Sequence, residues 1–267
     1  MSSDLTIVTL TFQPSTDATS RLMTDLAFGL RERGIQVSVI TSNRNYIDSK
    51  QGYKEEESCG ALRVVRVKMP RLDKNSTVQK FLMYWLFARR AVGELRRLRP
   101  KVVLTMIPPL FAPYRTIKFA RKKNIKSIFL VHDLLPDAWG NLGLIKHGTV
   151  FRILRNQLNK TLDHASSVVV IGRDMKEYVV ENYSKEIEKK VISIPNWANN
   201  DSSQSDNGLS ASMKDKFVIM YGGNFGEAQD FQSLLEAARI IKEKDKNILF
   251  IMVGNGRKEE VLKEYVA

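Results

Sequence analysis

The 267-residue sequence holds a single cysteine, Cys59, so it cannot form an internal disulfide. One thiol and no disulfide framework suit a reducing compartment. The first ten residues lack the basic cluster and long apolar stretch of a secretory signal. The longest uninterrupted apolar run, Phe81–Ala88, is far too short to cross a bilayer. We therefore expect a cytoplasmic protein.

Several ligand-binding motifs are also missing. The sequence has no Asp-x-Asp pair to hold a divalent ion beside a diphosphate, so we expect neither a metal nor another cofactor. It shows no helix-turn-helix, zinc or aromatic-strand motif, so nucleic acid is not an expected partner. Salt-sensitive retention of DNA at physiological salt would revive that alternative.

Negative charge is scarce in the first part of the chain. Residues 1–198 carry 33 Lys and Arg against 18 Asp and Glu, whereas residues 199–267 carry 9 against 11. The net charge of +13 is thus +15 on the first part and −2 on the second. Such an uneven field attracts phosphate groups or anionic lipid heads, although a positive surface can also serve solubility alone.

The beginning of the chain has the pattern of a βαβ unit. A strand, a polar loop, a helix and a second strand are predicted at Leu5–Leu10, Phe12–Ser20, Arg21–Arg33 and Val37–Thr41. Asp17 or Ser20 can cap the helix. In a parallel sheet the loop would lie at the carboxyl end of the first strand, where open α/β sheets bind ligands.

Alternating strands and helices continue to residue 198. Further strands are predicted at Leu62–Val67, Lys101–Met106, Ser127–Val131, Ser167–Ile171 and Val191–Ile194. Helices are predicted at Thr77–Leu98, Phe151–Leu162 and Arg173–Tyr183, and residues 43–60 read as a polar excursion. The sequence therefore predicts a Rossmann-like α/β domain with a parallel sheet at residues 1–198.

The segment Thr77–Leu98 combines apolar and basic residues. One apolar stripe is predicted from Val78, Leu82, Trp85, Ala88, Val92 and Leu95, and further aromatic residues flank it. Arginines crowd the other end of the segment: Arg89, Arg90, Arg96 and Arg97. This is typical either of a core helix with solvated arginines or of a helix on an anionic membrane surface, which those arginines would face.

A histidine and a carboxylate follow one of the predicted strands. His132 and Asp133 come directly after Ser127–Val131, which places them on the ligand side of the sheet. The pair suits chemistry, so we predict both as catalytic residues, although a lone histidine is more often structural.

A second domain is predicted after a Ser-, Asn- and Asp-rich linker at residues 199–215. In residues 216–267, strand Phe217–Tyr221 leads into a turn with Gly222, Gly223 and Gly226 and then a helix. Such a turn either binds a phosphate or is merely tight. Another strand, Ile248–Val253, and a last helix follow. Two strands and two helices bury too little apolar surface for a stable domain, so we expect this domain to be incomplete.

Five segments together resemble the retaining glycosyltransferases of family 4, closest to bacterial members that build surface polysaccharides. They are FQPSTDATSRLMTDLAFGLRERGIQVSVITSNRNY, VHDLLPDAWGNLGLI, VVVIGRDMKEYVVENY with VISIPNWAN, YGGNFGEAQDFQSLLEAA, and FIMVGNGRKEEVL. The resemblance covers nearly the whole chain. It implies the GT-B fold, with a complete first Rossmann-like domain and the first βαβα part of a second.

The resemblance also implies roles for particular residues. The donor diphosphate and nucleotide would be approached by Gly223, Asn224, Gly226, Gly254, Gly256, Arg257 and Lys258. The acceptor side would be flanked by Thr16, Asp17, Ala18 and Thr19, and His132 would lie near the transferred sugar. The sequence departs from the family at Glu227 and Gln229, where a cation is usual, and lacks the family's later pair of glutamates. We therefore expect weak donor binding and little turnover; tight binding would contradict this.

The predicted function is transfer of a sugar from a nucleotide-sugar to a lipid-linked glycan acceptor, with retention of configuration, at the inner membrane face. Two alternatives remain open: a sugar-nucleotide epimerase of the same fold, which would change the donor sugar without an acceptor, and a non-catalytic fragment.

Overall fold

The structure is a computed structural model that describes residues 3–45, 52–54, 56–59, 62–71, 76–198, 213, 215–226 and 229–266. The chain divides into two compact units, Met1–Ala198 and Asn199–Ala267, each described here by itself. The predicted linker 199–215 lies almost entirely outside the described residues.

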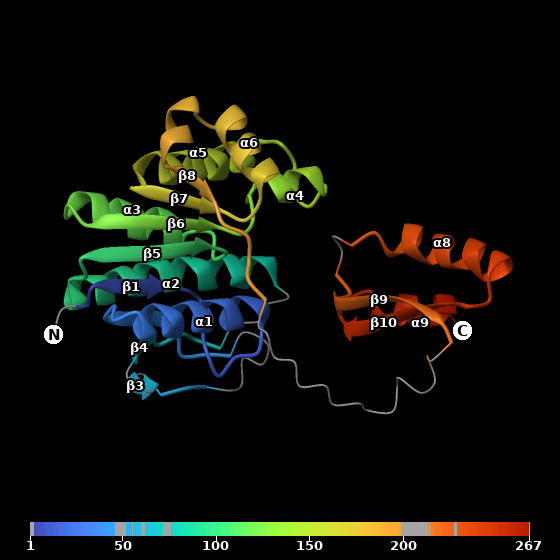
Figure 1. The fold of residues 1–267 in the computed structure, drawn as a ribbon. Coiled ribbons are helices and arrows are strands. Elements are labelled where there is room, and N and C mark those ends of the chain that lie inside the picture. The colour runs from blue at the N-terminus through green and yellow to red at the C-terminus, as the bar shows by residue number, and fades with distance from the viewer. Residues whose placement is uncertain are drawn as a thin grey trace. The chain divides into compact units, whose positions relative to one another are not determined.

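The first unit contains an eight-stranded sheet in the order β3-β4-β2-β1-β5-β6-β7-β8 (Figure 1). Its strands are β1 Leu5–Val8, β2 Val37–Ser42, β3 Glu56–Cys59, β4 Leu62–Val67, β5 Val102–Ile107, β6 Lys126–Val131, β7 Ser167–Val170 and β8 Val191–Ser193. Its helices are α1 Ala18–Glu32, α2 Thr77–Leu98, α3 Ala112–Lys122, α4 Asp137–Asn141, α5 Thr149–His164, α6 Arg173–Asn182 and the 3-10 helix η1 Lys185–Lys190.

All strands of this sheet except β3 are parallel to one another, as predicted. Strand β3 was not predicted. Residues 43–60 were expected to be a polar excursion, yet Glu56–Cys59 pair antiparallel with β4. An edge strand needs only one hydrogen-bonded neighbour, so its side chains can be polar and give no apolar signal. Of the same segment, residues 46–51, 55 and 60 lie outside the described residues.

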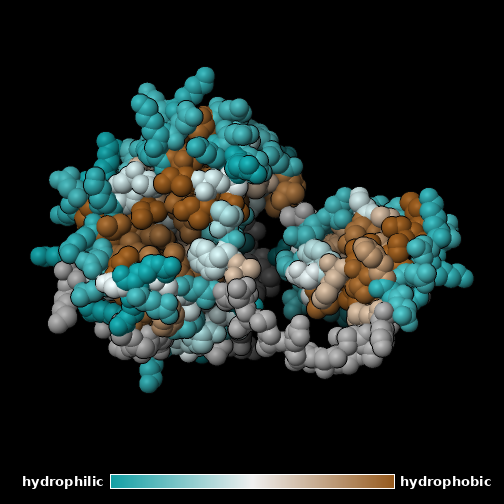
Figure 2. Space-filling model, in the orientation of Figure 1, coloured by the Kyte–Doolittle hydropathy of each residue, from teal (hydrophilic) through white to brown (hydrophobic). Residues whose placement is uncertain are grey.

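Helices cover the two faces of the sheet unequally. Helices α2, α3, α5 and α6 share one apolar cluster with the inward side chains of the strands. On the other face α1 is the only helix of the described residues that joins the cluster. A groove of about 620 Å³ remains there, lined by sheet residues that include Leu104, Ile128, Leu130 and Val169. Figure 2 shows the hydrophobic surface that this face exposes over the middle strands.

The apolar stripe predicted on α2 is correct at Ala88 and Leu95, which are buried, and wrong in its first half. Val78, Leu82 and Trp85 are exposed. Besides Ala88 and Leu95, the buried side chains of α2 are Tyr84, Phe87, Ala91 and Leu98. Because α2 packs on both the sheet and α3, its buried face is rotated toward the aromatic residues that flank the predicted stripe.

The second unit consists of β9 Phe217–Asn224, α8 Phe231–Lys244, β10 Ile248–Asn255 and α9 Glu259–Val266. The two strands are parallel and pair Gly223 with Gly254. Both helices contribute to a small core of Phe225, Phe231, Leu235 and Leu262. The expected glycine turn is corrected here, because strand β9 continues through Gly222 and Gly223 to Asn224.

Candidate functional site

The loop after β1 is organised around Asp17, the N-cap of α1. Its carboxylate accepts hydrogen bonds from the Ser20 backbone N–H at 3.0 Å and the Thr11 hydroxyl at 2.9 Å. The Ser15 hydroxyl donates to its other oxygen at 2.7 Å. Of the two predicted capping residues, Asp17 is the N-cap, because Ser20 lies inside the helix. These bonds give Asp17 a structural task, while the neighbouring Thr16 and Ala18 are exposed.

His132 and Asp133 follow β6 directly, as the sequence indicated. His132 is half-buried, and this burial lowers the pKa of its imidazole below the ordinary value. Asp133 has exposed surface, but the chain packed around its carboxyl raises its pKa by desolvation. A neutral imidazole at pH 7 can donate one hydrogen bond and accept another.

The loop around Asp17 and the pair His132 and Asp133 lie at the same edge of the sheet, the one formed by the carboxyl ends of the parallel strands. The parallel strands β1 and β6 both end there, and only β5 separates them. Neighbouring strands are about 4.8 Å apart, so the chain positions at the two strand ends are on the order of 10 Å apart. The apolar groove on the α1 face reaches this edge at His132, Asn196 and Trp197.

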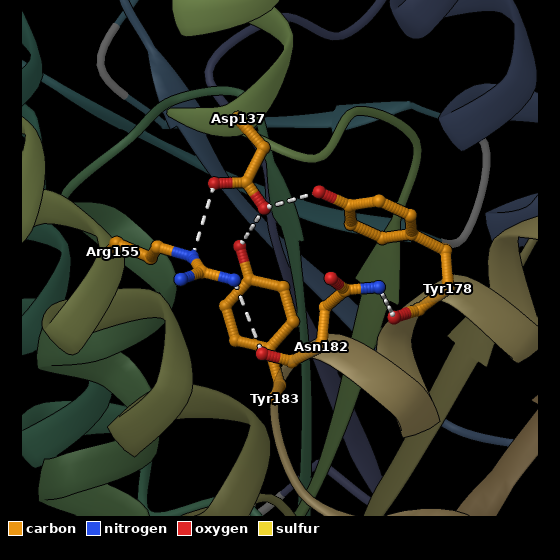
Figure 3. Close-up of polar contacts among 5 residues, drawn as sticks. All are labelled: Asp137, Arg155, Tyr178, Asn182 and Tyr183. Atoms are coloured by element: carbon orange, nitrogen blue, oxygen red, sulfur yellow. Dashed lines mark hydrogen bonds and ion pairs between the residues drawn. The ribbon is translucent and has the colours of Figure 1, made fainter. Parts of the chain in front are cut away.

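A buried polar cluster holds the segment that carries His132. Asp137, at the start of α4, is 4% exposed. Its carboxylate accepts hydrogen bonds from Tyr183 at 2.5 Å and Tyr178 at 3.1 Å, and its other oxygen lies 3.4 Å from the Arg155 guanidinium (Figure 3). The four side chains come from α4, α5, α6 and the end of α6, so the cluster ties the three helices together.

The cluster also raises the pKa of its two tyrosine members. Burial, and then the hydrogen bond to Asp137, raises the pKa of the Tyr183 phenol. Burial followed by the charge of Asp137 does the same to Tyr178. Both phenols are therefore fixed as hydrogen-bond donors. The sequence analysis did not predict this cluster, because nothing local in the sequence links Asp137 to tyrosines 41 and 46 positions away.

In the second unit, glycines allow the carboxyl ends of β9 and β10 to approach closely. A Cβ on Gly254 would lie 1.8 Å from the Gly223 carbonyl oxygen, and one on Gly256 would lie 2.4 Å from the Phe225 carbonyl oxygen. Around Gly226 an added Cβ would meet the side chains of Asn224 and Gln229. The predicted donor-binding residues Gly223, Asn224, Gly226, Gly254 and Gly256 are thus brought together.

The polar groups at these strand ends are already engaged with one another. The Gly226 N–H donates to the Gln229 side chain at 3.1 Å, and the Lys258 ammonium donates to the Gln229 carbonyl at 3.2 Å. Asp230 caps α8 through the Ser233 N–H. Arg257 is exposed. Glu227 lies outside the described residues. Lys258 is therefore a cation placed beside the glycine cluster.

The four arginines predicted to face a membrane differ in their surroundings. Arg89 lies over the Trp85 ring at 5.7 Å, and Arg97 pairs with Glu94 at 2.8 Å. Arg90 and Arg96 are exposed. Among the described helices, none is long and apolar enough to cross a membrane. Likewise, the described part of the chain contains no group of three His, Cys, Asp or Glu side chains that could hold a metal.

Comparison with known proteins gives a family match. The model of "Glycosyltransferase Family 4" matches residues 19–201. The chain is 26% identical over 269 aligned residues to WcaI of Escherichia coli (strain K12), whose name places it as a glycosyl transferase in colanic acid biosynthesis; the match covers 92% of this chain and 64% of WcaI. It is also 26% identical over 211 residues to WbjE of Pseudomonas aeruginosa, named as a glycosyltransferase, covering 74% of this chain and 51% of WbjE.

The fold is shared with a solved glycosyltransferase. The catalytic domain of Starch Synthase IV from Arabidopsis thaliana, bound to ADP and acarbose, matches with a TM-score of 0.70 at 12% identity. That match covers 100% of this chain and 71% of the other. The predicted GT-B fold is confirmed. The chain spans less than two thirds of the length of both curated relatives.

Proposed function

Because the chain belongs to glycosyltransferase family 4, we propose that it takes part in transferring a sugar from a nucleotide-sugar donor to a lipid-linked glycan acceptor. The transfer retains the anomeric configuration and serves the synthesis of a surface polysaccharide. The two curated relatives carry glycosyltransferase names, and one name cites colanic acid, which supports this proposal.

The observation that carries the donor part is the close-packed glycine cluster of the second unit. With no side chains at Gly223, Gly254 and Gly256, the ends of β9 and β10 offer bare backbone beside Lys258. Phosphate oxygens need such backbone approach and a nearby cation. The leaving group of the reaction is a nucleoside diphosphate, so fixed positive potential at this place stabilises the charge that develops on it. Asn224, Gly226 and Arg257 complete the proposed donor contacts.

The first unit supplies the proposed reacting groups. His132 acts as a neutral hydrogen-bonding group at the transferred sugar, consistent with its lowered pKa, and Asp133 is its neighbour at the same edge. Thr16, Asp17, Ala18 and Thr19 flank the acceptor; Asp17 does so through the loop shape that it holds. The chain works at the inner membrane face, with Arg89, Arg90, Arg96 and Arg97 toward anionic lipid.

A transfer assay tests this function. The chain is incubated with a bacterial membrane extract and a panel of radiolabelled nucleotide-sugars, and label is followed into the lipid-extractable fraction. We expect weak incorporation that depends on one donor and is abolished by His132→Ala. A labelled donor whose sugar is converted without any acceptor would identify an epimerase instead. The anomeric configuration of the product, read by NMR, tests retention.

A further inference from the structure

Six large apolar side chains are exposed around the start of α2, the connection from α4 to α5, and the start of α5. They are Val78, Leu82, Leu142, Leu144, Val150 and Ile153, here called the edge patch, and each is between 45% and 78% exposed. A soluble protein rarely gathers so many large apolar side chains on one face unless something binds there.

Packing beneath the surface joins these elements. The Phe81 ring on α2 lies 6.0 Å from the Trp139 ring on α4 and 5.9 Å from the Phe111 ring before α3. Gly140 on α4 packs against Phe151 on α5, where an added Cβ would lie 2.8 Å from the ring. The edge patch therefore belongs to neighbouring elements of one surface rather than to scattered sites.

The start of α5 is apolar on two sides. Phe151, Leu154 and Leu158 are buried in the first unit, while Val150 and Ile153 on the same turns are exposed. A helix that contacts water on its outer face carries polar residues there. The second apolar side consequently indicates contact with another apolar medium.

The charge of this region favours an anionic lipid surface as the binding partner of the edge patch. Residues 74–164, which contain α2 to α5, hold 18 Lys and Arg and 4 Asp and Glu, a net of +14. The rest of residues 1–198 holds 15 Lys and Arg and 14 Asp and Glu, so this block carries nearly all of the positive excess of the first unit. Lys146 and Arg152 are exposed among the apolar residues of the patch, and no acidic residue occurs from 138 to 162.

The flank of the patch has the side-chain chemistry of a membrane interface. Trp85, on α2 beyond Leu82, is 37% exposed. The guanidinium groups of Arg89 and Arg115 lie over its ring at 5.7 Å and 5.6 Å. Tryptophan and arginine place their apolar parts in lipid and their polar parts at the headgroups.

We propose that the edge patch inserts into an anionic lipid surface, with the surrounding cations on the headgroups. This inference rests on the proposed function and deepens it, because the patch lies close to the proposed reacting groups: α4 begins four residues after Asp133. It also moves the main membrane contact from Arg96 and Arg97 to the opposite end of α2. Insertion there would hold the edge that carries His132 near a lipid-linked acceptor.

Vesicle co-sedimentation tests the inference with the 267-residue chain. Vesicles contain equal parts phosphatidylglycerol and phosphatidylcholine, or phosphatidylcholine alone. The variant Leu144→Glu/Ile153→Glu is compared with Val253→Glu/Val261→Glu, which makes the same charge change at two exposed apolar positions of the second unit. Because two apolar side chains leave the lipid, we expect binding to anionic vesicles to weaken at least tenfold in the first variant and less than twofold in the second.

A second readout reports insertion directly. Leu144→Trp should show a blue-shifted emission when anionic vesicles are added, whereas Val261→Trp should not. The inference is overturned if the wild-type chain does not bind anionic vesicles, if the edge-patch variant binds as the wild type does, or if both Glu pairs weaken binding equally. It is also overturned if only Arg96→Glu/Arg97→Glu abolishes binding. Vesicle binding needs no donor or acceptor, so its failure is separate from failure of sugar transfer.

Discussion

The Tyr183 hydroxyl donates a 2.5 Å hydrogen bond to the buried carboxylate of Asp137, and this bond fastens the end of α6 to the start of α4. The segment between β6 and α4 carries His132 and Asp133. Its position therefore depends on a contact between residues 46 positions apart in the sequence.

Replacing Tyr183 should cost more stability than replacing its neighbour. Tyr183→Phe removes a buried donor from a carboxylate, which typically costs about 1.5–3 kcal/mol. Tyr178→Phe removes a longer bond, 3.1 Å against 2.5 Å, so about 1 kcal/mol or less is expected. Urea unfolding of both variants measures the difference. Equal losses would mean that the short Tyr183 bond has no special weight.

The burial of His132 should appear in the pH dependence of stability. Its pKa is lower in the folded chain than in the unfolded chain, so the unfolded state gains a proton first as the pH falls below about 6.5. The wild type thus loses stability on acidification. His132→Gln lacks this loss, so its stability relative to the wild type should improve between pH 8 and pH 5. NMR titration of His132 gives the pKa itself, and a value at or above 6.5 would contradict the account.

Asp17 should behave as a helix cap. Asp17→Ala removes the acceptor for the Ser20 N–H and two hydroxyl groups, and loss of an N-cap typically costs about 1 kcal/mol. Asp25→Ala, inside the same helix, is the matched control and should change the unfolding free energy by less than half of that. If only acceptor binding fell in Asp17→Ala while stability was unchanged, the capping explanation would be wrong.

The close contact between β9 and β10 predicts a strong penalty at one glycine. Gly254→Ala places a Cβ 1.8 Å from a backbone oxygen, so the strands must separate, and overpacking of this kind costs about 1–3 kcal/mol. Gly222→Ala meets nothing within 4 Å and should be neutral or slightly stabilising. Amide hydrogen exchange within residues 217–255 distinguishes the two. Comparable protection in both variants would argue against the close approach.

The sequence predicted most of the first unit because its strands are short apolar runs bounded by Gly, Pro and polar loops. Strand β5 at Val102–Ile107 and helix α2 at Thr77–Leu98 lie where the patterns put them. The membership of glycosyltransferase family 4 and the GT-B fold, both expected from the resemblance, are confirmed. The retaining mechanism and the incomplete second domain stay predictions.

The features that the sequence did not predict depend on contacts between residues that are far apart along the chain. The buried face of α2 depends on where α3 packs, so periodicity alone chose Val78 and Leu82 over Tyr84. Strand β3 is polar because it lies at an edge. Glycines usually end a strand, yet Gly222 and Gly223 continue β9 because β10 brings Gly254 beside it. The Asp137 cluster joins α4, α5 and α6, and no local pattern encodes such a meeting.

The central claim is that the glycine cluster with Lys258 receives a nucleoside diphosphate, and NMR titration of the 267-residue chain with UDP, ADP and GDP tests it most directly. Weak, saturable binding of one of them should shift the amide signals of residues 223–226 and 254–258. Lys258→Ala should weaken it about tenfold, Lys258→Arg should retain it, and Lys242→Ala on the exposed part of α8 should leave it unchanged. Saturable binding that leaves those amides unshifted, or that Lys258→Ala does not weaken, would contradict the account.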